Sequence, residues 1–179
     1  MKALSTVRAL SGVRRAWPGR DGSITFELAA PAGKLRAGRV NREGEVWITG
    51  YASDPELPEL TPGVAGRLVV HRFHRRAVVL ACDRAIKFTR QGRANAVAVQ
   101  SSQVAELCDS GITAARVLTH SPSRVELALL PGRTLHDLGG DALPGWRRFA
   151  ETWPGLVARP AGLPEHTGAD EANVLWRWF

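Results

Sequence analysis

The sequence predicts an α+β protein: an antiparallel β-rich amino-terminal segment, then a five-stranded antiparallel sheet with one helix, then carboxyl-terminal helices. Two observations support this prediction. Between residues 20 and 130, short runs rich in Val, Ile, Leu and Thr alternate with turns of Gly, Pro, Asn or Asp, which is typical of antiparallel strands. Within that part, only residues 94–108 repeat apolar side chains at helical spacing, and the Trp-rich residues after 134 indicate a second helical region.

The amino-terminal segment combines a helix with a small meander. Residues 1–16 alternate small apolar and basic side chains, and we expect a short amphipathic helix that ends before Pro18. Turn sequences then separate three strands, which we expect to form an antiparallel meander: residues 23–29, 34–40 and 45–51. A loop rich in proline and glycine, residues 53–66, ends this β-rich cap-like part, which we place at residues 1–60.

The second part, residues 61–138, contains three strands, one helix and two further strands. The helix is indicated by residues that recur along one face: Val97, Gln100 or Ser101, Val104 and Leu107. Gly111 is well placed just past the end of this helix, and Pro131 stops the last strand. The expected elements are strands at residues 67–73, 76–81 and 84–89, the helix at 94–108, and strands at 115–119 and 124–130.

The third part, residues 139–179, is expected to be helical. We predict a helix at residues 146–153 that Pro154 breaks, and a second helix that Thr167 caps at its amino end. The tryptophans of this part are expected to pack in a core, or against a part of the protein outside this chain: Trp146, Trp153, Trp176 and Trp178.

The charge of the chain does not indicate a nucleic-acid partner. The 179 residues include 24 Lys and Arg against 17 Asp and Glu, a net charge of +7. The arginines are scattered, with acidic residues nearby in most places, and no zinc-finger, RNP or helix-turn-helix signature accompanies them. We therefore interpret them as a solvated surface. The densest basic run, residues 71–76, surrounds the turn between two predicted strands, and we expect its side chains to be exposed, with contact to a phosphate as the alternative.

The sequence favours a cytoplasmic protein. Its two cysteines, Cys82 and Cys108, cannot form a disulfide framework, which is typical of a reducing compartment. No apolar run approaches the roughly 20 residues of a membrane span. Arginines interrupt the amino-terminal residues, so these lack the apolar block of a signal peptide.

Three motifs occur in order along the second part. Residues 84–89 read Arg-Ala-Ile-Lys-Phe-Thr, residues 107–118 join the end of the helix to the fourth strand, and residues 126–135 read Glu-Leu-Ala-Leu-Leu-Pro-Gly-Arg-Thr-Leu. Together with the order of strands and helix, they resemble the small lobe of the aminoglycoside phosphotransferase and maltokinase-like family. The resemblance covers about residues 66–138 and implies a kinase-like small lobe that binds ATP with Mg.

The resemblance assigns a nucleotide site. Lys87 is similar to the strand lysine whose ammonium neutralises phosphates of ATP. The carbonyl of Ala128 and the amide of Leu130 would bind adenine, with Leu127 at the back of the pocket. Gln100 stands where the family commonly has the glutamate that holds the lysine, and an amide can still hydrogen-bond an ammonium.

The chain departs from the family in its catalytic loop. The family uses two aspartates, one in an H-x-D-x-x-x-x-N loop and one for magnesium, and neither arrangement is present. His166 and Asn173 have the right separation, but Gly168 takes the place of the aspartate. We therefore expect no catalytic residue or metal ligand in this chain, no transfer by it alone, and a large lobe supplied by a partner chain or a missing carboxyl-terminal part.

Two alternatives stay open at the level of the sequence. The chain could be a complete, partner-dependent pseudokinase-like module that docks through its Trp-rich end, or a small β-rich binding protein without nucleotide. Other kinds of site are not indicated, because the five histidines are dispersed and no Walker A, Rossmann or G-x-S-x-G motif occurs.

Overall fold

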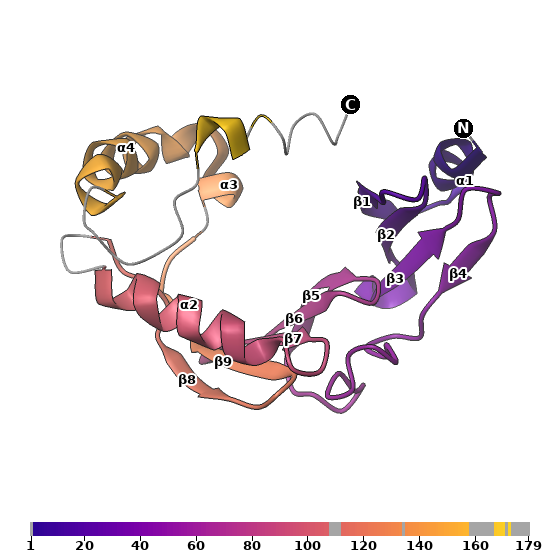
Figure 1. The fold of residues 1–179 in the computed structure, drawn as a ribbon, viewed down its shortest axis with the longest axis horizontal. Helices are drawn as coiled ribbons and strands as arrows, with labels where there is room; N and C mark the ends of the chain where they lie inside the picture. The colour runs from indigo at the N-terminus through magenta and orange to yellow at the C-terminus, as the bar shows by residue number, and fades with distance from the viewer. Residues whose placement is uncertain (1, 108–111, 134, 158–166, 171, 173–179) are drawn as a thin grey trace.

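The structure, a computed structural model, describes residues 2–107, 112–133, 135–157, 167–170 and 172. It is an α+β fold with a four-stranded and a five-stranded antiparallel sheet, which we call sheet A and sheet B (Figure 1). Helix α1 precedes sheet A, helix α2 follows the first three strands of sheet B, and helix α4 follows both sheets. The predicted class and the five-stranded antiparallel sheet are confirmed.

Sheet A is a meander in the order β1-β2-β3-β4. Its strands and the helix packed on it are α1 (Lys2–Ala9), β1 (Val13–Pro18), β2 (Ile24–Ala29), β3 (Leu35–Val40) and β4 (Val46–Ile48), with a short 3-10 turn η1 (Pro31–Gly33) between β2 and β3. Ala3 and Val7 of α1 are buried against Phe26, Leu28 and Val40. The three predicted strands are confirmed in the predicted order.

The prediction of one helix through residues 1–16 is wrong in its second half, which forms β1. Helix α1 ends at Ala9, and Gly12 makes the turn into β1 with a φ of +78°, a conformation that favours glycine. Its carbonyl accepts a hydrogen bond of 2.9 Å from the amide of Ala29, which starts the pairing of β1 with β2. The pattern of small apolar and basic residues fits either element, and the partner strand decides between them.

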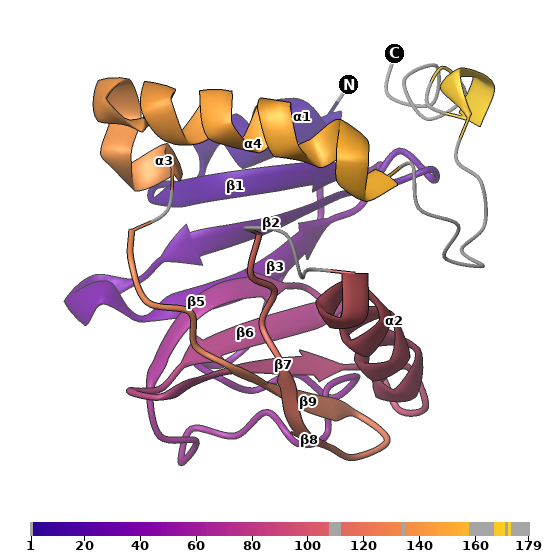
Figure 2. The same cartoon turned by 90° about the vertical axis from the view of Figure 1, so that its left-hand side faces the viewer.

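Sheet B has the strand order β5-β6-β7-β9-β8, so the last strand is inserted beside the third (Figure 2). Helix α2 contacts β8 and β9. The predicted elements are confirmed with ends displaced by up to two residues, as β5 (Arg67–Arg72), β6 (Arg76–Leu80), β7 (Arg84–Thr89), α2 (Ala94–Leu107), β8 (Val117–His120) and β9 (Arg124–Ala128). Gly111 lies outside the described residues.

The loop between the two sheets contains no helix or strand, as predicted, but it also forms part of the core. Ala52, Leu57 and Leu60 of this loop are buried together with Leu35 of β3. The same cluster contains side chains of sheet B: Leu68, Ala77, Val79, Ile86 and Phe88. One apolar core therefore joins sheet A to sheet B across the loop.

The carboxyl-terminal part begins with a helical turn α3 (Leu135–Leu138) and a 3-10 turn η2 (Gly139–Ala142), followed by α4 (Leu143–Val157). The predicted break at Pro154 is wrong: α4 continues for three more residues to Val157, although proline removes one amide donor from the helix. The predicted cap is confirmed, since the Thr167 hydroxyl accepts a hydrogen bond of 3.2 Å from the amide of Asp170.

The tryptophans of α4 are not in the core. Trp146 is 54% exposed and Trp153 is 45% exposed, which contradicts the expectation of core packing for both. Phe149 lies between them on the helix: its ring stacks on Trp153 with a centroid distance of 5.1 Å and meets Trp146 edge-on at 6.3 Å. Trp176 and Trp178 lie outside the described residues.

Candidate functional site

Lys87 lies in the middle of β7 and points away from the core that joins the sheets. Its neighbours Ile86 and Phe88 are 5% and 0% exposed in that core. Because side chains alternate across a strand, Lys87 faces the opposite side of sheet B, where it is half-buried. Among the described residues, it forms no hydrogen bond or ion pair, so its ammonium is available to a ligand.

An open cavity of about 320 Å³ lies between α2 and sheet B, and it contains Lys87. Gln100 from α2 and Leu127 from β9 line the same cavity. The remaining lining residues are small or apolar: Val97, Ser101, Val104, Ala114 and Ala115. Three of the five residues that the sequence assigned to nucleotide binding therefore come together, from a strand, a helix and a second strand.

Helix α2 is anchored by alanines and presents its predicted stripe to the cavity. Ala94 and Ala98 are buried against Val125 and Leu127 of β9. Because these contacts hold the helix close to the sheet, the stripe that includes Gln100 is placed over the cavity. Among the residues that the structure describes, the lining contains no carboxylate, and Glu106 is exposed. The polar groups that α2 brings to the cavity of Lys87 are therefore the Gln100 amide and the Ser101 hydroxyl.

Ala128 and Leu130 lie at the end of β9, next to the cavity lining but not part of it. Strand β9 is shorter than predicted because its partner β7 begins only at Arg84. Just beyond the strand, the amide of Leu129 donates a hydrogen bond to the carbonyl of Asp83 at 3.1 Å. The amide of Leu130 follows this last bond and has no hydrogen bond within the described part of the chain. It is therefore a free donor beyond the edge of the cavity.

Two arginines lie on the same face of sheet B as Lys87. Arg72 pairs in register with Arg76, and Arg76 pairs with Thr89, two residues beyond Lys87 on β7. The side-chain alternation therefore places them on the face of Lys87. Burial, and then repulsion by Arg75 and Arg76, lowers the pKa of Arg72, whose buried Nε has no partner among the described residues. This end of the face carries uncompensated positive charge.

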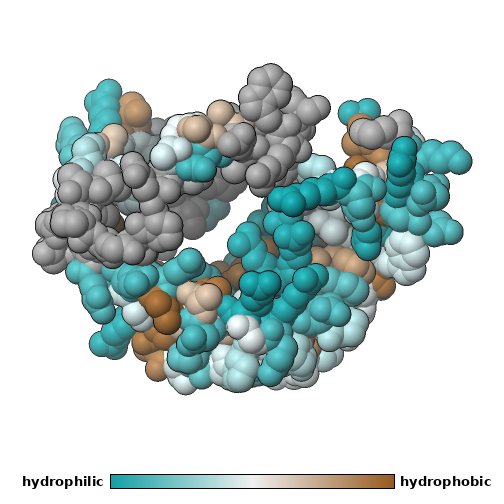
Figure 3. Space-filling view, in the orientation of Figure 1, coloured by the Kyte–Doolittle hydropathy of each residue, from teal (hydrophilic) through white to brown (hydrophobic). Residues whose placement is uncertain are grey.

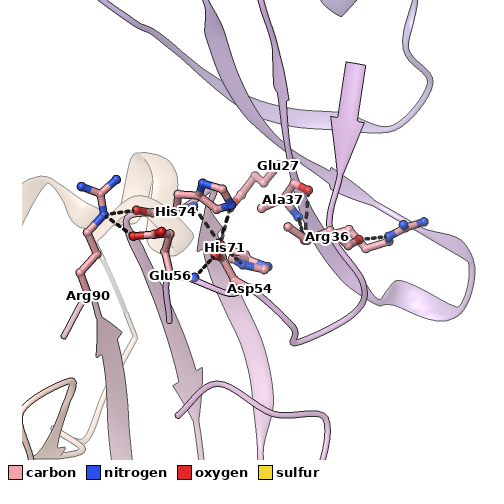
Figure 4. Close-up of polar contacts among 9 residues, drawn as sticks. Glu27, Arg36, Ala37, Asp54, Glu56, His71, His74 and Arg90 are labelled. Atoms are coloured by element: carbon pink, nitrogen blue, oxygen red, sulfur yellow. Dashed lines mark hydrogen bonds and ion pairs between the residues drawn. The ribbon is translucent and has the colours of Figure 1, made fainter. Parts of the chain in front are cut away.

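A buried polar cluster at the junction of the two sheets was not predicted (Figure 4). His71 is 0% exposed, so the expectation of exposed side chains along the run 71–76 is wrong at this residue. Its Nε2 lies 3.3 Å from a carboxylate oxygen of Asp54, and its amide donates to Glu27 of β2 at 3.1 Å. The register of β5 with β6 shifts between Leu68 and Val70, which turns both Leu68 and His71 inward.

Asp54 is the centre of this cluster. Its carboxylate also accepts hydrogen bonds from the amides of His74, at 2.8 Å, and Glu56, at 3.0 Å. Burial acts to raise the pKa of Asp54, but the hydrogen bond with His71 and these two bonds from amides outweigh it and lower the pKa below its usual value. Because the cluster is enclosed and joins three segments, it holds the two sheets together.

Comparison of the chain with models of protein families, with curated proteins and with solved structures found no match. Among the described residues, no three His, Cys, Asp or Glu side chains come together as a metal site. None of the described helices combines the length and apolar character needed to cross a bilayer.

Proposed function

We propose that this chain is the nucleotide-binding small-lobe portion of a kinase-like phosphotransferase that transfers no phosphate by itself. The observation that carries the proposal is the cavity between α2 and sheet B, where Lys87, Gln100 and Leu127 meet. These residues come from the third strand, the helix and the last strand of sheet B, as the resemblance to the aminoglycoside phosphotransferase and maltokinase-like family implies.

The chemistry of the cavity suits ATP. The Lys87 ammonium has no counter-ion within the described residues and would neutralise phosphate oxygens, while the Gln100 amide can orient it. Arg72 and Arg76 add positive charge on the same face. Leu127 supplies an apolar wall for the base, and the free amide of Leu130 supplies a donor beyond it.

The cavity does not suit magnesium by itself. Within the described part of the chain its lining contains no carboxylate, and Mg²⁺ in phosphoryl-transfer sites is bound through one or two carboxylates together with phosphates. We therefore place the metal ligands and the catalytic base on another part of the enzyme, and this chain binds, orients and shields the nucleotide.

The exposed aromatic face of α4 supports a partner that completes the enzyme. Trp146, Phe149 and Trp153 are 54%, 39% and 45% exposed on one helix that follows sheet B. Aromatic side chains of this kind are enriched in protein interfaces. The partner is a large lobe, either on another chain or on a further part of this protein.

The cytoplasm is the compartment that fits this function, because Cys82 is an exposed free thiol and the ligand is ATP.

The test is a thermal melt in increasing ATP with magnesium, because a ligand that prefers the native state raises the melting temperature. We expect a saturable rise in the unmodified protein, and an apparent affinity at least about tenfold weaker in Lys87→Ala. Lys34→Ala is the matched control, since Lys34 is an exposed lysine between η1 and β3, outside sheet B, and it should keep the unmodified affinity. An unshifted melt, or an equal shift in Lys87→Ala, contradicts the proposal.

A further inference from the structure

Sheet A carries a second and larger cavity, of about 530 Å³, on its own side of the molecule. Three segments that are distant in sequence form it: the first turn of α1, the turn between β1 and β2, and the turn between β3 and β4. Its lining residues are Lys2, Ala3, Arg20, Asp21, Gly22 and Arg42. Hydrophilic side chains gather over this end of the molecule (Figure 3).

The cavity holds more positive charge than its surroundings compensate. The side chains of Lys2, Arg20 and Arg42 form no hydrogen bond or ion pair within the described residues. The one carboxylate in the lining, Asp21, accepts hydrogen bonds from the hydroxyl and the amide of Ser23, at 2.6 and 3.1 Å, and pairs with Arg39. The bonds from Ser23, and then Arg39, lower the pKa of Asp21, so its charge is kept and is already matched.

The three segments are fixed against one another, which sets the positions of the cations. The amide of Gly19 donates to the carbonyl of Ser23 at 2.7 Å and closes the first turn. A Cβ atom added at Gly22 would lie 3.6 to 3.8 Å from side-chain carbons of Arg42, so the aliphatic part of this arginine packs on that turn. A Cβ atom added at Gly44 would lie 3.6 Å from the Cβ of Lys2, so the turn between β3 and β4 lies against α1.

We propose that this cavity binds a small phosphate ester that carries at least two negative charges. Three cations without a counter-ion in the described part of the chain surround one cavity and attract a multiply charged anion. Two of them are guanidinium groups, which can each donate two parallel hydrogen bonds to the oxygens of a phosphate. The volume lies in the range of about 300 to 1,000 Å³ that small-molecule sites occupy. The site is on sheet A and does not depend on the nucleotide proposed for sheet B.

The experiment titrates the full chain with pyrophosphate by calorimetry, in a Lys87→Ala background that weakens the other anion-binding face. We expect saturable binding that Arg20→Gln/Arg42→Gln weakens at least about tenfold. Arg93→Gln/Arg147→Gln removes the same two charges from exposed arginines outside sheet A and should keep the affinity. A circular dichroism melt shows whether each variant is folded, and backbone NMR shifts at Ala3 and Gly22 report the site directly in the background protein.

Shifts at Ala3 and Gly22 that saturate together with the heat of binding support the proposal. It is overturned if pyrophosphate does not saturate, if both double variants weaken binding equally, or if the shifts fall only on sheet B. Binding of citrate without binding of pyrophosphate also overturns it, because the site would then select carboxylates.

Discussion

Asp54 is the residue on which the junction between the sheets most depends. It is 4% exposed and bonds to His71, His74 and Glu56, which lie on a strand, a hairpin turn and the loop. Neither its place in a proline-rich loop nor the residues beside it distinguish it from an exposed turn aspartate. What distinguishes it is His71, which lies 17 positions away and is turned inward by the irregular pairing of β5.

We predict that Asp54→Asn lowers the free energy of unfolding by about 2 to 3 kcal/mol at pH 7, because the buried donors lose a charged acceptor. The pKa of Asp54 is lower in the folded chain than in the unfolded one. Its contribution is therefore complete above the unfolded pKa of about 4 and is lost as the pH falls through the folded value. Urea midpoints at pH 7, 5 and 3.5 measure both effects.

Between pH 5 and 3.5, Asp54→Asn should lose less stability than the unmodified protein. The stability of the variant still depends on pH, since the pKa values of Glu59 and Glu126 are also lowered by their partners. Equal slopes in the two proteins would show that the Asp54 carboxylate does not stabilise the junction.

At the scale of single elements, sheet A depends on the close approach of β2, β3 and β4 at Gly38. A Cβ atom at this position would lie 2.6 Å from the carbonyl oxygen of Trp47 and 2.8 Å from Cε2 of Phe26, and closer still to Cζ of the same ring. We predict that Gly38→Ala destabilises the protein by about 1 to 3 kcal/mol, because the fully buried Phe26 ring must move. Gly63→Ala, with no atom within 4 Å, is the control and should change stability by less than about 0.5 kcal/mol in the same denaturation experiment.

The elements differ in how well local pattern predicts them. The strands of sheet B and α2 were predicted within two residues at each end, because their alternating or helical patterns match the faces that they bury. The pattern of α4 also has an apolar face, but Trp146 and Trp153 remain exposed on it. Periodicity identifies a helix and its apolar side, and it does not identify what covers that side.

At the scale of the whole molecule, the shared core predicts that the two sheets unfold together. Leu57 of the connecting loop is 0% exposed and packs with residues of both sheets. We predict one calorimetric transition for the unmodified protein. Leu57→Ala should lower the free energy of unfolding by about 2 to 5 kcal/mol and lower the melting temperature of both sheets equally. Leu118→Ala, at a 40% exposed position of β8, should change stability much less. Two separate transitions would contradict a single core.

The sequence by itself determined the α+β class, the order of strands and α2, and the side of β7 on which Lys87 lies. These features depend on residues two to four positions apart, so local spacing encodes them. Only the tertiary structure decided that β9 lies between β7 and β8, that residues 13–18 form a strand, and that His71 meets Asp54 and Glu27. The same is true of the cavity that joins Arg20 and Arg42. These contacts connect segments up to 44 positions apart, and strand pairing with core burial selects them where neighbouring residues cannot.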